Sequence, residues 1–272
     1  MKPWGDVDGF INLIFPLSDI EDKVKETSAS KLSGASIYGY FRNTERIIKH
    51  LYEIKKLNYV LDNVAIDDNI AQTELKNQKA YESLQLNEAI NSCITDGSIV
   101  WYFRGEANEI QSVRDFNKLL SRVCEVVYHK TPIIRNELFN RQKLSSAISL
   151  ARVNLLEAML ANSDKEAFGI EGFPPEKTIY YTLFRESGIH RQDENGQWVL
   201  GTPTSDELSS LWKASVDFVN STIDKPRKLS DLSKILRTAP YKLKQGIIDF
   251  WIPIFLYINQ QDFALYNGNT FV

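Results

Sequence analysis

The last fifth of the chain constrains the fold most, because it holds a helix with no polar face. Residues 247–258 are apolar at nearly every position and are interrupted only by Asp249 and Pro253. A helix that is hydrophobic all round is buried in its own domain or against a partner. The run is too short to span a bilayer, which takes about 20 residues. It therefore predicts a buried helix at the centre of a packed unit.

The elements around this run follow the order of a winged helix. A short helix is expected over 229–236, then a turn over 239–246, the buried helix, and a hairpin over 264–271. The basic residues stand before the apolar helix rather than on it. A helix that reads base edges needs a polar outer face. We therefore expect this unit to pack against other elements rather than insert into a major groove.

A second winged-helix-like order is expected upstream. Apolar residues at helical spacing over 144–159 predict one helix, and Pro175 suits the first turn of another. Asn195–Gly196 then predicts a hairpin turn. Thr204 and Glu207 form a capping-box pattern for the helix that follows.

The first half of the chain reads as helices with few strands. Strands are expected over 9–15 and 99–103, and a mobile connector over 21–34. Further helices are predicted at 41–61, 67–94 and 113–127. Asp67–Asp68 is the start signal of the second, and the capping box of Ser112 and Asp115 is that of the third.

Together these patterns predict a mainly α protein: a helical N-terminal part and two winged-helix-like units with short β-hairpins. Four segments are expected. They are an irregular N-terminal segment (1–35), a helical domain with a short hairpin (36–130), a winged-helix-like domain (131–222) and a C-terminal winged-helix-like unit (223–272). Because the chain ends directly after a predicted strand, we expect the last unit to be truncated and the chain to be a piece of a longer protein.

Composition is that of an ordinary globular protein and excludes a strongly basic nucleic-acid binder. The net charge is −3, with 43% hydrophobic and 25% charged residues. The N-terminus lacks the apolar core of a signal peptide. Cys93 and Cys124 fall on apolar helical faces, which favours buried free thiols in a reducing cytosol. We expect a cytoplasmic protein with no membrane partner.

No motif for catalysis is present. The chain has neither a phosphate-loop pattern nor a dinucleotide-binding glycine pattern, and no serine lies in a nucleophile elbow. His50, His129 and His190 stand apart from any metal-ligand spacing. Asp67–Asp68 could hold a cation, but a helix N-terminus explains the pair better. We expect no catalytic residue, cofactor or metal in this chain, although residues distant in sequence could still assemble a site.

Two basic segments are the recurring polar feature. Residues 225–244 hold seven cations against Asp231 alone, and residues 129–152 hold five against Glu137 alone. Such clusters bind a phosphate backbone without reading sequence, and they also occur as plain solvated faces. The aromatic residues 101–103 could stack on bases, although core packing is the more common use. The candidate nucleic-acid-binding residues are Lys225, Arg227, Lys228, Lys234, Arg237, Lys242, Lys244, Arg135, Arg141 and Lys143.

Six short stretches carry a resemblance to a known group of proteins. They are Val100–Gly105, Thr131–Leu138, Asn140–Ser146, Phe173–Tyr180, Gly188–His190 and Pro240–Gly246. Their order resembles the region downstream of the ATPase core in very large bacterial P-loop proteins of phage-defence islands, including BREX-type systems. The resemblance covers roughly residues 95–272 and implies helical and winged-helix modules beside an AAA-type ATPase. The phosphate loop of that family is missing here, so the resemblance transfers no catalytic residue.

Three functional hypotheses follow, in order of preference. The first is a non-catalytic module of a large phage-defence ATPase, which positions partner subunits or the DNA backbone around the motor. The second is a stand-alone winged-helix protein that binds duplex DNA. The third is an enzyme whose site is assembled from residues distant in sequence.

Overall fold

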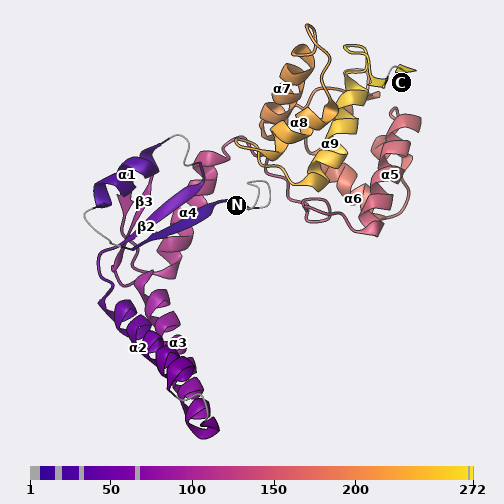
Figure 1. Cartoon of the computed structure of the whole chain (residues 1–272). Helices are drawn as coiled ribbons and strands as arrows, with labels where there is room; N and C mark the ends of the chain where they lie inside the picture. Colours follow the sequence, from indigo (N-terminus) through magenta and orange to yellow (C-terminus); the bar gives the residue numbers. More distant parts are fainter. Residues whose placement is uncertain (1–6, 16–19, 31–33, 65–67, 269, 272) are drawn as a thin grey trace. The chain divides into compact units, whose positions relative to one another are not determined.

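The computed structural model describes residues 7–15, 20–30, 34–64, 68–268 and 270–271. The fold is mixed α/β with 54% helix. The chain divides into two compact units, Met1–Val127 and Tyr128–Val272. The sequence correctly predicts that helix predominates. The prediction did not include the four-stranded sheet of the first unit (Figure 1). No helix among the described residues is long and apolar enough to cross a membrane.

The first unit is built on a sheet with the strand order β1-β2-β3-β4. β1 runs parallel to β2, whereas β2–β3 and β3–β4 are antiparallel. The strand at 9–15 and the strand at 99–103 are confirmed, and β2 and β4 were not predicted. The strands are β1 (Phe10–Ile14), β2 (Ser36–Phe41), β3 (Ile99–Phe103) and β4 (Glu106–Asn108).

The connector expected over 21–34 is wrong at residues 21–29, which form a helix, and residues 31–33 of that prediction lie outside the described residues. Helix α1 (Glu21–Ala29) links the parallel strands β1 and β2. Val24 and Ser28 are buried on its inner side, and Val24 packs with Tyr40, Val100 and Tyr102 of the sheet. Apart from Ala29, the remaining residues of α1 are charged or polar, so only Val24 and Ser28 mark its buried side.

Helix α4 (Val113–Val127) belongs to the same unit, and its predicted start is confirmed. The Asp115 amide donates to Ser112 Oγ at 3.1 Å, and Ser112 Oγ donates back to the Asp115 carboxylate at 2.6 Å. The Trp101 ring lies 4.8 Å from the ring of Phe116 on this helix. Residues 101–103 are all buried, so they pack in the core and are not exposed for stacking on bases.

The two long helices expected at 41–61 and 67–94 are present, and they pack side by side as an antiparallel hairpin (Figure 1). They are α2 (Glu45–Asn63) and α3 (Asn69–Cys93). The Asp68 carboxylate caps α3 by accepting from the amides of Ile70 and Ala71, as predicted, whereas Asp67 lies outside the described residues. His50 Nδ1 lies 2.7 Å from Glu82 Oε2 across the hairpin.

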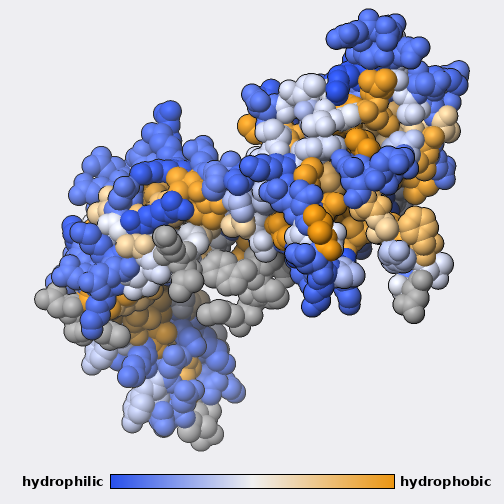
Figure 2. Space-filling view, turned by 90° about the horizontal axis from the view of Figure 1, so that it is seen from above, coloured by the Kyte–Doolittle hydropathy of each residue, from blue (hydrophilic) through white to orange (hydrophobic). Residues whose placement is uncertain are grey.

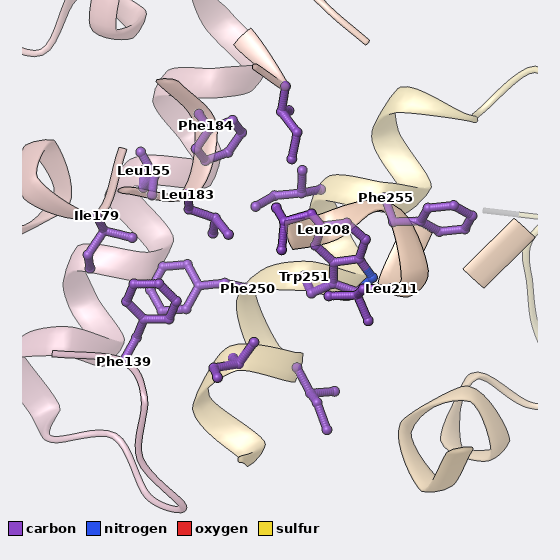
Figure 3. Close-up of a cluster of buried hydrophobic side chains, with 14 of the residues drawn as sticks. Phe139, Leu155, Ile179, Leu183, Phe184, Leu208, Leu211, Phe250, Trp251 and Phe255 are labelled. Atoms are coloured by element: carbon purple, nitrogen blue, oxygen red, sulfur yellow. The ribbon is translucent and has the colours of Figure 1, made fainter. Parts of the chain in front are cut away.

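The second unit is mostly helical and has one core. Side chains from α5 to α9 form a single cluster of buried residues, in which the rings of Phe139 and Phe250 lie 5.1 Å apart (Figure 3). Its longer elements are α5 (Ser146–Ala161), α6 (Pro175–Tyr180), α7 (Asp206–Asn220), α8 (Leu229–Arg237) and α9 (Gln245–Ile258). Its hairpins are β5 (His190–Gln192) with β6 (Trp198–Leu200), and β7 (Tyr266–Asn267) with β8 (Thr270–Phe271).

The order helix, helix, hairpin therefore occurs twice in this unit, while the winged-helix arrangement itself stays a prediction. The burial of α9 is confirmed, with Phe250, Trp251 and Ile254 fully enclosed. Residues predicted as the separate segments 131–222 and 223–272 contribute to the same core.

Two local predictions are wrong. Helix α7 begins after Ser205 rather than Thr204 and has no side-chain cap, so the expected capping box is not formed. Cys124 is exposed, whereas Cys93 is buried, and both are free thiols. Cys124 lies next to the buried Val123 on α4, and one helical position turns a side chain by about 100°.

Candidate nucleic-acid interface

The chain makes a tight turn between α8 and α9, and this turn carries several of the predicted cations. The amide of Leu243 donates to the carbonyl of Leu236 at 2.8 Å, which brings the start of α9 back to the end of α8. Leu236 and Leu243 are buried, whereas Arg237 and Lys244 are exposed. The apolar residues therefore anchor the turn and leave the cations at the surface.

A second segment lies against this turn. The amide of Lys130 donates to the carbonyl of Pro240 at 3.2 Å, and the Thr131 hydroxyl donates to the carbonyl of Tyr241. The ammonium group of Lys130 lies 6.0 Å from the centre of the Tyr241 ring. Lys130 is thus placed beside Lys242, although more than a hundred residues separate them in sequence.

A third segment packs on the first turn of α9. The amide of Gly246 donates to the carbonyl of Arg141 at 2.8 Å, and the amide of Gln245 donates to the Gln142 side chain at 3.4 Å. A Cβ atom at Gly246 would lie only 2.3 Å from the carbonyl oxygen of Phe139. Glycine is required for this close approach, which places Arg141 and Lys143 next to Lys244.

The two predicted basic segments therefore meet at one place. We call it the basic turn and define it by six residues from three stretches of chain: Lys130, Arg141, Lys143, Arg237, Lys242 and Lys244. Each is exposed or half-exposed. Sequence reasoning named five of them as candidates and left Lys130 out of that set, because only the tertiary contact with Pro240 shows where Lys130 belongs.

The other predicted cations do not join the basic turn. Lys225, Arg227 and Lys228 lie at or before the start of α8, and the nine residues of that helix span about 13 Å. Arg227 donates to Ser221 Oγ at 2.8 Å and lies 4.7 Å from the Phe218 ring centre.

Two of the remaining candidates have carboxylates beside them. Lys234 pairs with Asp231 at 3.1 Å. Arg135 lines a small hollow of about 140 Å³ together with Glu186 and Glu207. A carboxylate competes with phosphate for a cation, so these two residues are weaker candidates than those of the basic turn.

Among the described residues, no carboxylate forms an ion pair with Arg141, Lys143, Arg237 or Lys244 of the basic turn. The Arg141 Nε donates to the backbone carbonyl of Glu137 at 2.8 Å, which orients the guanidinium. Burial, and after it the charge of Asp217, raises the pKa of Tyr241, so its phenol stays protonated at neutral pH.

Of the three histidines, His190 is buried and cannot be reached by a substrate. His190 and Tyr180 are fully buried, with His190 Nδ1 2.8 Å from the Tyr180 hydroxyl and Nε2 2.9 Å from the carbonyl of Ser163. Burial lowers the pKa of His190, partly opposed by that carbonyl. Since a carbonyl only accepts, Nε2 carries the proton and Nδ1 accepts from Tyr180. Within the described part of the chain, no group of three potential metal-ligating side chains occurs.

One polar cluster was missed by the sequence analysis. The Glu21 carboxylate accepts from the Tyr102 hydroxyl at 2.5 Å and from Arg42 at 2.9 Å. Burial, and after it the hydrogen bond to Glu21, raises the pKa of Tyr102 to about 12. These two hydrogen bonds join α1 to β3 and to the residue that follows β2. Nothing in the sequence signals it, because its members lie 21 to 81 residues apart.

Comparison with known proteins assigns no family. No family model, no curated protein and no solved structure matches the chain. The resemblance to the phage-defence ATPases stays a prediction, and the geometry of the basic turn carries the functional argument.

Proposed function

We propose that this chain is a non-catalytic module that binds the phosphate backbone of duplex DNA through the basic turn. The observation that supports this most is the convergence of six cations from three distant stretches, fixed by backbone hydrogen bonds. The net charge of the chain is −3, so the convergence is not a by-product of a basic protein. Backbone atoms hold the stretches together, so the charged ends of Lys143, Arg237 and Lys244 take no part in that contact.

The chemistry of the turn suits phosphate and not bases. Lysine offers a point charge and arginine a fork of donors, and both bind phosphate oxygens without reading sequence. The adjacent helix α9 buries Ile247, Phe250 and Trp251, so it has no polar face for the major groove. In this proposal α8, the basic turn and α9 form a winged-helix-like unit that contacts DNA by its turn.

The same proposal includes a larger parent protein. One of the resembling stretches, Pro240–Gly246, contains Lys242 and Lys244 of the basic turn, and Asn140–Ser146 contains Arg141 and Lys143. We propose that the chain serves as an assembly and DNA-positioning module beside the ATPase of a bacterial phage-defence protein. The absence of a phosphate-loop pattern supports a role without nucleotide hydrolysis. Measurable ATP hydrolysis by the purified chain would contradict that role.

The test is binding of the full chain to a labelled duplex of mixed sequence at low salt, followed by fluorescence anisotropy. The double variant Lys143→Glu with Lys244→Glu reverses two exposed charges of the basic turn. The matched control, Lys49→Glu with Lys55→Glu, reverses two exposed charges on α2. We expect the first pair to abolish binding and the second to leave most of it. Equal losses from both pairs, or no binding by the wild type, would remove the proposal.

A further inference from the structure

A buried histidine holds the segment between α5 and α6 at two points. His190 Nε2 donates to the carbonyl of Ser163 at 2.9 Å, and its Nδ1 accepts from the Tyr180 hydroxyl at 2.8 Å. Burial raises the pKa of Tyr180, and a hydrogen bond from the backbone of Ala167 opposes that rise. Since a donor is what stabilises a phenolate, the Ala167 amide donates to the same hydroxyl. The imidazole is thus connected, directly and through Tyr180, to the backbone at 163 and at 167.

The connected segment has an unfavourable backbone conformation. Ala167 and Phe168 are left-handed, with φ of 49° and 53°, and Gly169 follows with φ of 68°. We call residues 167–169 the left-handed turn. Glycine adopts this conformation at little cost, whereas a residue with a Cβ atom is strained in it. The Phe168 ring offsets the strain, because it is buried with its centre 4.4 Å from that of the His190 ring. The turn therefore depends on contacts around the neutral imidazole.

A second proton on His190 has no place in this arrangement. The protonated ring would direct its Nδ1–H at the Tyr180 hydroxyl, which already receives the Ala167 amide. If the hydroxyl turned to accept from Nδ1, its own proton would lose the acceptor that it has now. A buried donor without an acceptor is costly, and a buried charge without a partner is more so.

The charged groups on the surrounding elements do not stabilise an imidazolium at His190. Arg185, which follows α6, opposes protonation by its charge. Arg191, next to it on β5, donates to two backbone carbonyls. Glu166, which precedes the left-handed turn, acts through its charge on Tyr180. Within the described part of the chain, no carboxylate forms an ion pair or a hydrogen bond with the imidazole. Protonation in the closed structure is therefore unfavourable.

We propose that protonation of His190 releases the left-handed turn, so that residues 162–170 form a pH-sensitive latch on the second unit. In the open form, water solvates the imidazolium and the left-handed residues relax. Opening takes Phe168 out of the core of a unit on which Phe173 is 99% exposed and hydrophobic side chains already reach the surface (Figure 2). The latch thus exposes an aromatic ring in mild acid and covers it at neutral pH.

The direction of the effect follows from the two states of the histidine. Burial lowers the pKa of His190 below its ordinary 6.5, so the open form binds the proton more tightly than the closed form does. Lowering the pH from 7.5 to 5.5 therefore raises the open population. One proton bound by a solvated imidazole sets an upper limit of about tenfold over this range.

The test is amide hydrogen exchange of the full chain, followed by mass spectrometry at pH 7.5 and 5.5 and corrected for intrinsic exchange rates. We expect residues 162–170 to exchange several-fold faster at pH 5.5, with no such change in α9. His190→Gln has no titrating ring and should remove the difference. Equal exchange of the latch at both pH values, equal acceleration in α9, or a difference that persists in His190→Gln would overturn the proposal.

A second pair of variants tests the strain without changing His190. Gly169→Ala adds a Cβ atom in left-handed backbone, 3.6 Å from the nearest side-chain atom, so it introduces strain without a clash. Gly196→Ala is the matched control, since it adds the same strain with open space around it in the β5–β6 hairpin. We expect Gly169→Ala to speed exchange of the latch about fivefold or more at both pH values, and Gly196→Ala to leave it unchanged. Equal rates in Gly169→Ala and the wild type would contradict a strained latch.

Discussion

The α2–α3 hairpin and the helices of the second unit use apolar residues in opposite ways. Helix α9 buries seven of its residues in the shared core, whereas α2, which is longer, buries only Ile47. Ile48, Tyr52 and Tyr59 of α2 are each more than half exposed. The helices of the second unit are therefore held by packing, and those of the hairpin by their seam, end caps and polar pairs. The same helical periodicity in a sequence thus leads to two different sources of stability.

The largest expected effect is a loss of stability, which should be much greater in the packed core of the second unit than on the α2–α3 hairpin. Trp251→Ala removes a fully buried ring that donates to Ser215 Oγ at 3.0 Å, and we expect a loss of about 3–5 kcal/mol in the free energy of unfolding. Tyr59→Ala on α2, where the ring is 66% exposed, should change it by about 0.5 kcal/mol or less. Urea denaturation followed by circular dichroism measures both. Similar losses at the two sites would remove the contrast.

The next effect tests the close approach that builds the basic turn. Gly246→Ala sets a Cβ against backbone oxygen, and we expect a loss of about 1–3 kcal/mol together with weaker DNA binding. Gly201→Ala is the control, because the atom nearest its Cβ is the flexible end of Arg191 at 3.2 Å. The comparison is made by thermal unfolding and by anisotropy with labelled duplex. Unchanged stability of the Gly246 variant would show that the two stretches do not meet closely.

A smaller effect is expected at the cap of the hairpin. Asp68→Ala frees the amides of Ile70 and Ala71, and we expect a loss of about 1 kcal/mol. Because the hairpin has little core, the loss should be local, with faster amide hydrogen exchange in the first turns of α3 and none in α9. Faster exchange spread through the second unit would contradict separate stabilisation of the two regions.

The smallest effect is a pH dependence confined to the second unit. Burial lowers the pKa of His190 below its ordinary 6.5, so the unfolded chain binds the proton more tightly than the folded chain does. The free energy of unfolding therefore falls as the pH drops through 6.5 and levels off below the folded pKa. Denaturation curves measured from neutral to mildly acidic pH should show this. His190→Gln should flatten the dependence, and His129→Gln, at an exposed position, should not.

Much of the fold was predictable because it depends on local signals. The caps at Asp68 and Ser112 and the apolar run of α9 were read directly from sequence. Strand β2 was missed because Gly39 interrupts its pattern of strand-forming residues. A Cβ atom at this position would lie 2.8 Å from the Trp101 ring, so the absence of a side chain makes room for Trp101 on the neighbouring strand. Helix α1 was missed because Val24 and Ser28 alone face inward.

The candidate site was predictable in composition but not in geometry. The sequence showed two basic segments, 129–152 and 225–244, as separate features. Their meeting depends on the backbone contact between Gly246 and Arg141 and on that between Lys130 and Pro240. A pattern of charges carries no information about contacts between residues a hundred positions apart. Such contacts are set by the shared core beneath them.

The most direct test of the account is the salt dependence of DNA binding by the full chain. The triple variant changes three cations of the basic turn to Gln: Lys143, Arg237 and Lys244. The control triple variant makes the same change at three lysines of the hairpin: Lys49, Lys55 and Lys76. The slope of log affinity against log salt concentration should decrease in magnitude by about 2–3 in the first triple variant, because each phosphate contact contributes about 0.9 to that slope. The control triple should keep the wild-type slope. Parallel slopes for all three proteins would show that the basic turn is a solvated face and not a phosphate-binding site.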